Sequence, residues 1–245
     1  MIKILHMYYD LMNLYGDWAN AEVLALELKA RGKNVSICKK TIGDEVNFSE
    51  YDFLYIGSGT ERSLIACLTD IMKYKSALLN KIEEGMYVLA TGNSHEIFGK
   101  AVTDATGTRH NALELLDFEA IQGRSRVTGD CVCKTSFLNE ELIGFINRAS
   151  IGQSASFERP FDVKLGPGAS DDMGDAGKKE AIQYKNLLGT YLTGPLLVRN
   201  PPLLKYFGDK ITGASAQPEE NQFFAFQEEA YKKALHELSN RIAVK

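Results

Sequence analysis

The sequence predicts a three-layer α/β domain, with a mostly parallel sheet and helices on both faces. Residues 2–9 and 34–39 are predicted strands, and a helical pattern that stops at Gly32 lies between them, which gives the β-α-β spacing of a parallel sheet. Residues 86–91 are a short apolar run that predicts a buried strand. A glycine turn follows, then a helical pattern from His95, and α/β enzymes place a nucleophile at such a turn.

The composition is that of a globular protein with a sizeable core. We expect one domain over residues 1–245, which ends in a helix at about 223–242. The net charge of −4 and the pI of about 5.7 give no support for nucleic-acid binding. No apolar run approaches the roughly 18 residues of a membrane span, and the N-terminus lacks the pattern of a signal peptide. These features predict a cytoplasmic protein without a membrane span.

The first half of the chain continues the α/β pattern. Residues 10–20 are a predicted loop that runs into the first helix, and residues 52–56 are the third predicted strand. The loop after that strand is Gly57-Ser58-Gly59-Thr60, and residues 63–85 hold helical segments. The loop 57–60 and the turn after residue 91 are therefore expected to lie together at the carboxyl ends of neighbouring strands, where open α/β sheets bind ligands.

The second half is less periodic. Residues 115–120, 126–135 and 141–147 are predicted strands, with adjacent ones antiparallel, and the Gly- and Asp-rich residues 165–180 are a predicted exposed loop. The C-terminal helix is amphipathic, and we expect its apolar stripe to pack on the sheet. That stripe comprises Phe226, Ala230, Ala234 and Leu238.

No metal or cofactor site is predicted. Cys131 and Cys133 have a single residue between them, too few for the usual zinc knuckle, and no second pair completes a site. Asp171 and Asp172 lack further spaced oxygen ligands, so a solvated turn is expected there.

Residues 86–99 resemble the nucleophile elbow of class I glutamine amidotransferases of the cobyric acid synthase (CobB/CobQ) type, whose domain is flavodoxin-like. The family elbow is roughly Ala-hydrophobic-Cys-Gly-Gly-Tyr-Gln-x-Leu-Gly, and Ala90 and Gly99 match it without a gap. The catalytic cysteine of the family then falls on Gly92, which has no side chain. The resemblance also implies that residues 57–60 are the relic of a loop that supplies an oxyanion-hole N–H, although a tight strand-to-helix turn would also explain them.

Two further stretches carry the resemblance. The family pattern Gly-Thr-Tyr-Leu-His-Gly-Pro-x-Leu-x-x-Asn-Pro is matched over residues 189–201 except at the histidine, whose place holds Thr193. That histidine is the general base of the family, and a threonine hydroxyl cannot take a thiol proton as imidazole does. Asn13-Leu-Tyr-Gly-Asp17 is close to a segment of GatD-type subunits of lipid II isoglutaminyl synthase.

The resemblance implies a glutaminase subunit that hands ammonia to a Mur-ligase-like (MurT-type) or other ATP-dependent ligase in peptidoglycan precursor modification. Because no nucleophile or base is intact, we expect a pseudoenzyme that acts as a heterodimeric partner or scaffold. One alternative is chemistry rebuilt from Asn93, Ser94, His95 and Glu96, although adjacent helical residues point about 100° apart and the Gly-x-Ser-x-Gly spacing is absent. The other is a sensor pocket for glutamine or a related small molecule.

Overall fold

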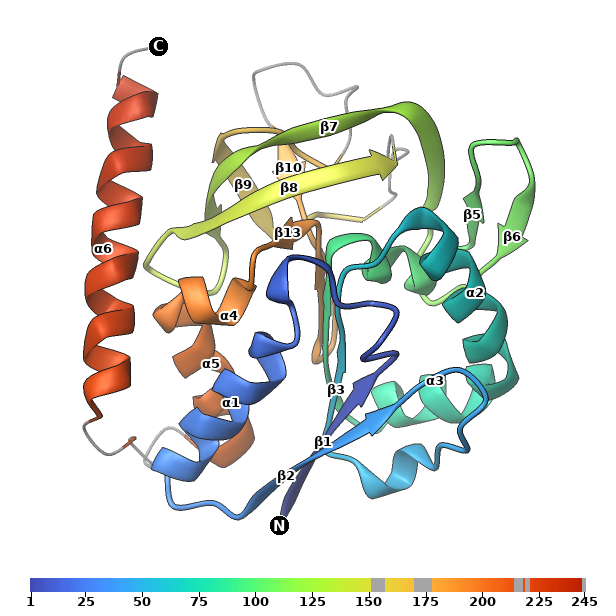
Figure 1. Cartoon of the computed structure of the whole chain (residues 1–245), viewed down its shortest axis with the longest axis horizontal. Coiled ribbons are helices and arrows are strands. Elements are labelled where there is room, and N and C mark those ends of the chain that lie inside the picture. Colours follow the sequence, from blue (N-terminus) through green and yellow to red (C-terminus); the bar gives the residue numbers. More distant parts are fainter. Residues whose placement is uncertain (151–156, 170–177, 214–217, 219–220, 244–245) are drawn as a thin grey trace.

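The computed structural model describes residues 1–150, 157–169, 178–213, 218 and 221–243. Its main sheet has six strands in the order β11-β12-β4-β3-β1-β2, and every neighbouring pair is parallel except β11 with β12 (Figure 1). The strands are β1 (Ile2–Met7), β2 (Val35–Lys40), β3 (Phe53–Ile56), β4 (Tyr87–Thr91), β11 (Ile182–Tyr184) and β12 (Leu187–Thr190).

The central strands are buried on both faces, as in other parallel sheets. In β4, Val88 and Ala90 belong to the core on one side of the sheet, and Leu89 belongs to the core on the other side. This alternation explains why the sequence of the strand is a continuous apolar run.

Helices cover both faces of this sheet, which confirms the predicted three-layer α/β fold. On one face α1 and α5 pack through Leu24, Leu28, Leu203 and Phe207, and on the other α2 and α3 pack through Leu64, Leu68, Leu78 and Ile82 (Figure 1). Burial of each such side chain contributes about 1.5–3 kcal/mol. The helices are α1 (Ala19–Ala30), α2 (Glu61–Ile71), α3 (Lys75–Glu83), α4 (Leu196–Arg199), α5 (Pro201–Thr212) and α6 (Gln222–Ala243).

A second group of strands lies beyond the carboxyl edge of the main sheet (Figure 1). The long strands β7 and β8 are antiparallel neighbours, as the sequence predicted. The prediction of a strand at 115–120 was largely wrong, because β7 begins only at Glu119. The group comprises β5 (Ala101–Thr103), β6 (Arg109–Asn111), β7 (Glu119–Thr135), β8 (Leu142–Ser150), β9 (Phe161–Leu165), β10 (Lys179–Glu180) and β13 (Leu192–Thr193).

The stripe predicted for the C-terminal helix α6 is correct only in its second half. Phe226 is 60% exposed and Ala230 is also exposed, whereas Ala234 and Leu238 pack, together with Tyr231, against Val132 and other residues of the second group of strands. The sequence does not show where that neighbouring surface begins along the helix. No helix in the described part of the chain is long and apolar enough to cross a bilayer.

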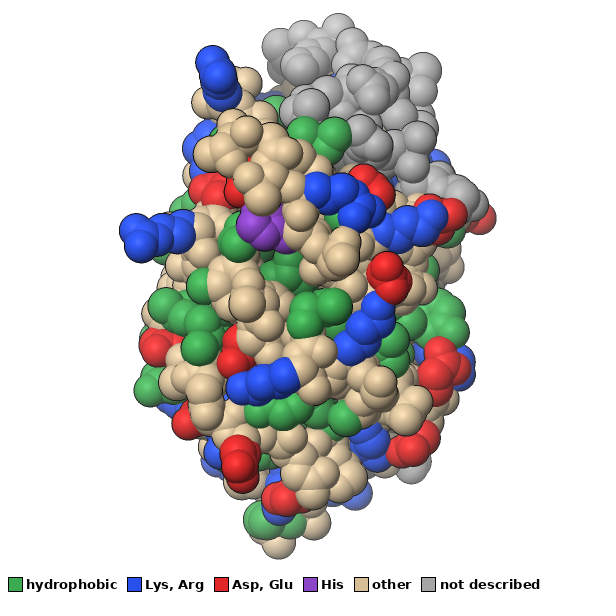
Figure 2. All heavy atoms as spheres, turned by 90° about the vertical axis from the view of Figure 1, so that its right-hand side faces the viewer, with side chains coloured by type: hydrophobic (Ala, Val, Ile, Leu, Met, Phe, Trp, Pro, Cys, Tyr) green, Lys and Arg blue, Asp and Glu red, His purple; other side chains and the backbone are tan. Residues whose placement is uncertain are grey.

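The face formed by α2, α3 and the β5–β6 hairpin carries charges of both signs with hydrophobic side chains between them (Figure 2). Several of these charges form ion pairs, such as Arg109 with Glu119 at 2.7 Å and Lys75 with Glu114. Exposed pairs of this kind contribute little to stability, about 0–1 kcal/mol each.

Candidate functional site

The site lies at the carboxyl ends of β3 and β4, which are neighbouring parallel strands. The loop of residues 57–60, here called the β3 loop, leads into α2, whose first turn is capped by the Thr60 hydroxyl accepting from the Ser63 N–H at 3.0 Å. Directly after β4 comes a 3-10 helix, Gly92–Phe98, here called the elbow. The sequence predicted a helix from His95, so the helical segment begins three residues earlier than expected.

Gly92 occupies the first position of the elbow, with a φ of +62° that favours glycine. A Cβ built on its backbone would lie 2.2 Å from Ser58 Oγ and 2.4 Å from Ser58 Cβ. The place that the resemblance assigns to a cysteine therefore has neither a side chain nor room for one while Ser58 stays where it is.

Asp17 connects the β3 loop, β4 and the segment after Thr193. Its Oδ2 accepts from the Ser58 N–H at 2.8 Å and from the Thr91 hydroxyl at 2.8 Å, and the Gly194 N–H also faces this carboxylate. Burial raises the pKa of Asp17 to about 6, against these hydrogen bonds, which lower it. The sequence marked Asp17 only as part of a motif, and its position here gives that match a structural reason.

Asn93 joins the elbow to the β3 loop. Its side-chain oxygen accepts from the Gly59 N–H at 3.0 Å, and its side-chain nitrogen donates to the Gly59 carbonyl at 2.9 Å. Together with the bond from Ser58 N–H to Asp17, this pairing engages two successive N–H groups of the β3 loop. Those N–H groups are therefore not free to stabilise an oxyanion.

Ser94 and His95 do not form a nucleophile–base pair. The Ser94 hydroxyl is buried, 2.9 Å from the Ile56 carbonyl oxygen and 2.8 Å from the Thr91 carbonyl oxygen, and these two acceptors share its one hydrogen. His95 places Nδ1 2.7 Å from the Gly92 carbonyl oxygen, and its buried ring packs edge-on against Tyr191. Burial lowers the pKa of His95 to about 3. These contacts are those of packed core residues.

Glu96 lies buried below the elbow. Its Oε1 accepts from the Tyr191 hydroxyl at 2.9 Å, and the Ser150 side chain also faces this carboxyl. Among the described residues, no donor lies within hydrogen-bond distance of its Oε2. Burial raises the pKa of Glu96 to about 7, so both the protonated and the ionised forms of this carboxyl are populated near neutral pH.

Thr193 occupies the position that the resemblance assigns to the general base. It is buried in β13, and its hydroxyl donates to the Phe145 carbonyl at 2.9 Å. A hydroxyl used in this way holds β13 to β8 and has no role in taking up a proton.

The retained residues of the 189–201 motif are mostly structural. Gly189 is needed because a Cβ there would lie 2.5 Å from His95 Cβ. Asn200 accepts from the Ile143 N–H at 2.7 Å and donates to the Ile143 and Leu196 carbonyls at 2.8 Å each. Pro201 then begins α5 at a position where the missing N–H carries no penalty.

The sequence did not point to the buried charged residues beside the elbow. Glu180 accepts from the Thr190 hydroxyl at 2.5 Å and from the Tyr191 N–H at 2.7 Å, and burial raises its pKa. Arg148 and Arg159 are also buried, and the Arg148 guanidinium lies 5.6 Å from the centre of the Tyr191 ring. Arg148 is the single charged residue of β8, whereas Glu180 follows Lys179 and Arg159 follows Glu158, and none of the three stands in a spacing pattern that would reveal it.

The two cysteines considered as metal ligands do not take part in the site. Cys131 and Cys133 are buried free thiols in β7. Asp171 and Asp172 lie outside the described residues.

Comparison with known proteins identifies the family. A model of the CobB/CobQ-like glutamine amidotransferase domain matches residues 3–201. The chain belongs to this family. It is 32% identical over 211 residues to the GatD subunit of lipid II isoglutaminyl synthase from Staphylococcus aureus (strain N315), covering 85% of this chain and 84% of that protein. It is 28% identical over 206 residues to the corresponding Streptococcus pneumoniae subunit, covering 82% and 77%.

Solved structures agree with this family at the level of the fold. PurLQS from Thermotoga maritima superposes with a TM-score of 0.55 at 10% identity, covering 96% of this chain and 99% of that one. A crystal structure of a glutamine amidotransferase gives a TM-score of 0.56 at 15% identity, covering 86% and 99%. The predicted class I amidotransferase architecture is therefore confirmed.

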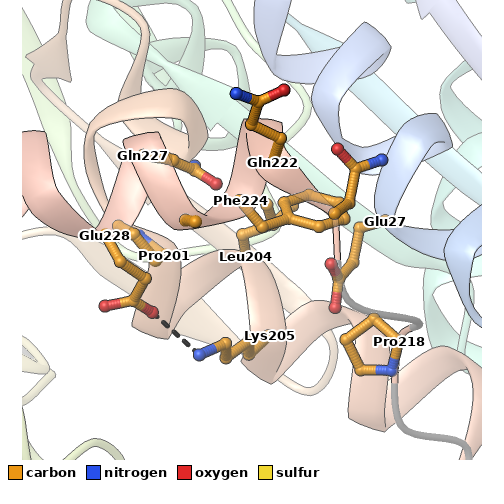
Figure 3. Close-up of a pocket in the computed structure, with 11 residues that line it drawn as sticks. Glu27, Pro201, Leu204, Lys205, Pro218, Gln222, Phe224, Gln227 and Glu228 are labelled. Atoms are coloured by element: carbon orange, nitrogen blue, oxygen red, sulfur yellow. Dashed lines mark hydrogen bonds and ion pairs between the residues drawn. The ribbon is translucent and has the colours of Figure 1, made fainter.

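A separate groove of about 720 Å³ lies between α1, α5 and α6 (Figure 3). Phe224 and Leu204 give it apolar walls, and Lys205 pairs with Glu228 at 2.8 Å along its rim. No residue of the elbow or of the β3 loop lines this groove.

Proposed function

We propose that this amidotransferase-family protein is inactive as a glutaminase and serves as the partner or scaffold of an ATP-dependent, Mur-ligase-like amidating enzyme that modifies a cell-wall precursor. The observation that carries this proposal is the pair Gly92 and Thr193 at the two positions that the resemblance assigns to nucleophile and base. Covalent hydrolysis of an amide by this route needs a thiolate and a group that takes its proton.

The surrounding contacts support inactivity. The N–H groups of Ser58 and Gly59 are engaged by Asp17 and Asn93. The buried hydroxyl of Ser94 faces backbone carbonyls. Chemistry rebuilt at the elbow therefore has no nucleophile in a reactive position.

The partner follows from the kind of protein that this chain resembles. Both relatives named above are subunits of a lipid II isoglutaminyl synthase. A glutaminase subunit is useful only when its ammonia reaches an acceptor on another domain, and this sequence contains no Gly-x-x-x-x-Gly-Lys-Ser/Thr phosphate loop of its own. We therefore propose a heterodimer with a MurT-type ligase in the cytoplasm.

Affinity capture from the native lysate, followed by size-exclusion chromatography, tests the partner. We expect an ATP-dependent ligase to be enriched and to co-elute with the chain at a defined stoichiometry. Elution as monomer or self-associated protein alone, with no ligase enriched, would contradict the heterodimer.

A sensor for glutamine or a related small molecule is the second candidate. The Glu96 Oε2 favours it, because a buried carboxyl oxygen without a donor at hydrogen-bond distance among the described residues would be stabilised by a ligand that donates a hydrogen bond. Isothermal titration with glutamine tests this function. Saturable binding that is lost in Glu96→Ala would support it, and absence of binding heat at millimolar glutamine would remove it.

A further inference from the structure

The β3 loop leaves no space for a side chain at position 92. Every side chain other than hydrogen begins with a Cβ, and a Cβ at this position would lie 2.2 Å from Ser58 Oγ and 2.4 Å from Ser58 Cβ. Carbon atoms in contact prefer a separation of about 3.5–4.0 Å. The conflict therefore precedes any question of which functional group the side chain carries.

Ser58 cannot relieve this conflict by changing its rotamer. Rotation about χ1 moves Oγ, but it leaves Cβ 2.4 Å from the added atom and Cα 3.1 Å from it. Opening the space therefore requires a shift of the backbone at Ser58 or at Gly92.

The backbone of the β3 loop is held from several sides. The Ser58 N–H donates to Asp17, and the Ser58 carbonyl accepts from the Leu14 N–H at 2.8 Å. Gly59 is paired with Asn93 through both its N–H and its carbonyl.

Met12 packs against the same loop. A Cβ added at Gly57 would lie 2.4 Å from the Met12 carbonyl oxygen, and one added at Gly59 would lie 2.3 Å from Met12 Sδ. The loop therefore lies so close to Met12 that it has little space into which to withdraw.

We propose that Ser58 is the residue that excludes a side chain from position 92. The β3 loop, which the resemblance relates to oxyanion stabilisation, fills the space beside the first residue of the elbow. A cysteine at position 92 would therefore require glycine in place of Ser58. This inference deepens the proposed inactivity and rests on it for the meaning of position 92.

A double-mutant cycle in the full chain tests the exclusion. Gly92→Ala is compared in the wild-type and Ser58→Gly backgrounds by chemical unfolding, and Gly107→Ala is the matched control. Gly107 also has a positive φ, +90°, but a Cβ there would meet nothing within 4 Å. Both alanines thus carry the backbone strain of a left-handed residue, and only Gly92→Ala adds the clash.

In the wild-type background we expect Gly92→Ala to raise the unfolding equilibrium constant about tenfold to a hundredfold more than Gly107→Ala does. In the Ser58→Gly background this excess should disappear. If Gly92→Ala alone does not fold, the expected result is that the double variant folds, with a midpoint below that of Ser58→Gly by no more than Gly107→Ala lowers the wild-type midpoint.

Two results would overturn the proposal. One is an excess of the same size in both backgrounds, or a double variant that does not fold, because another neighbour would then exclude the side chain. The other is no excess over Gly107→Ala, because the loop would then give way. The readout is stability alone, so glutamine hydrolysis by the wild-type protein would refute the proposed function without affecting this cycle.

Discussion

At the scale of single residues, burial determines what the polar side chains near the elbow do. Ser94, His95 and Glu96 stand side by side in the sequence, which suggested rebuilt chemistry, yet all three are buried and face different partners. A 3-10 helix turns its successive side chains by about 120°, so neighbours in sequence are not neighbours in space.

The same burial predicts a pH dependence for Glu96. The pKa of this carboxyl is raised from 4.5 to about 7 by burial, so the folded protein binds more protons than the unfolded chain between those values. Its contribution to stability therefore falls as the pH rises from 4.5 to 7. We expect Glu96→Gln to become more stable relative to wild type across this window, by on the order of 1–3 kcal/mol.

Urea unfolding at a series of pH values measures this difference, with the exposed Glu84→Gln as the matched control. The quantity to follow is the difference in free energy of unfolding between variant and wild type. His6 and His95 change the stability of both proteins with pH, in the opposite direction to Glu96. Burial lowers their pKa values to about 4 and about 3, so their contributions to stability increase with pH up to about 6.5. A Glu96→Gln difference that is constant from pH 4.5 to 7 would show that folding does not raise the pKa of Glu96.

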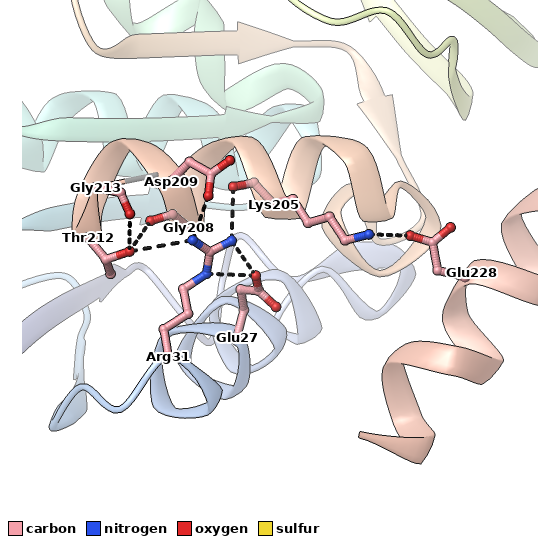
Figure 4. A network of polar contacts seen from close by, with 8 residues as sticks. All are labelled: Glu27, Arg31, Lys205, Gly208, Asp209, Thr212, Gly213 and Glu228. Carbon is pink, nitrogen blue, oxygen red and sulfur yellow. Dashed lines mark hydrogen bonds and ion pairs between the residues drawn. The ribbon is translucent and has the colours of Figure 1, made fainter. Parts of the chain in front are cut away.

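At the scale of elements, a buried ion-pair network joins α1 to α5 (Figure 4). Arg31, whose side chain is 1% exposed, donates to Glu27 Oε1 at 2.8–2.9 Å and to Asp209 Oδ1 at 2.6 Å. Gly208 makes room for the guanidinium, because a Cβ there would lie 2.7 Å from Arg31 Cζ. These contacts fix the position of α1 relative to α5 on this face of the main sheet.

We expect Arg31→Ala to lower the free energy of unfolding by about 3–5 kcal/mol, because it leaves the buried Glu27 carboxylate without its cation. Lys39→Ala is the control, since Lys39 pairs with Glu22 at 3.9 Å with both side chains about half exposed. That change should stay within about 0.5 kcal/mol. Equal, small effects of the two substitutions in chemical unfolding would mean that the network adds no stability.

At the scale of the whole molecule, the sequence predicted the main sheet better than the strands beyond it. The strands β3 and β4 are mostly apolar runs that each end directly before a glycine, and β1 is a mostly apolar run ahead of a helix, so local pattern was sufficient to place them. The β5–β6 hairpin has three-residue strands, too short for a pattern, and β7 continues through residues 121–125, for which no strand was predicted. The packing stripe of α6 depended on a surface that only the tertiary structure supplies.

The candidate site was predicted in part. The motifs located the elbow and the β3 loop correctly, because both are local strand-to-turn segments. They did not predict that Ser58 fills the space beside Gly92, or that Asp17 and Asn93 bind the N–H groups of the β3 loop, because those contacts join segments 34 to 41 positions apart. Residues of the 189–201 motif likewise make contacts that hold the fold together, such as those of Asn200 with β8, so a match to the motif does not by itself indicate catalysis.

The most direct test of the account is the hydrolysis of glutamine by the purified wild-type protein, followed as glutamate formed over time. In subtilisin, removal of the nucleophile or the base costs about 10⁶-fold in kcat, and this chain has Gly92 and Thr193 at the positions that the resemblance assigns to those groups. We therefore predict a rate equal to that of a protein-free blank, with the Staphylococcus aureus GatD subunit as the positive control. Glutamate formation that saturates with glutamine, exceeds the blank and persists through re-purification would contradict the account.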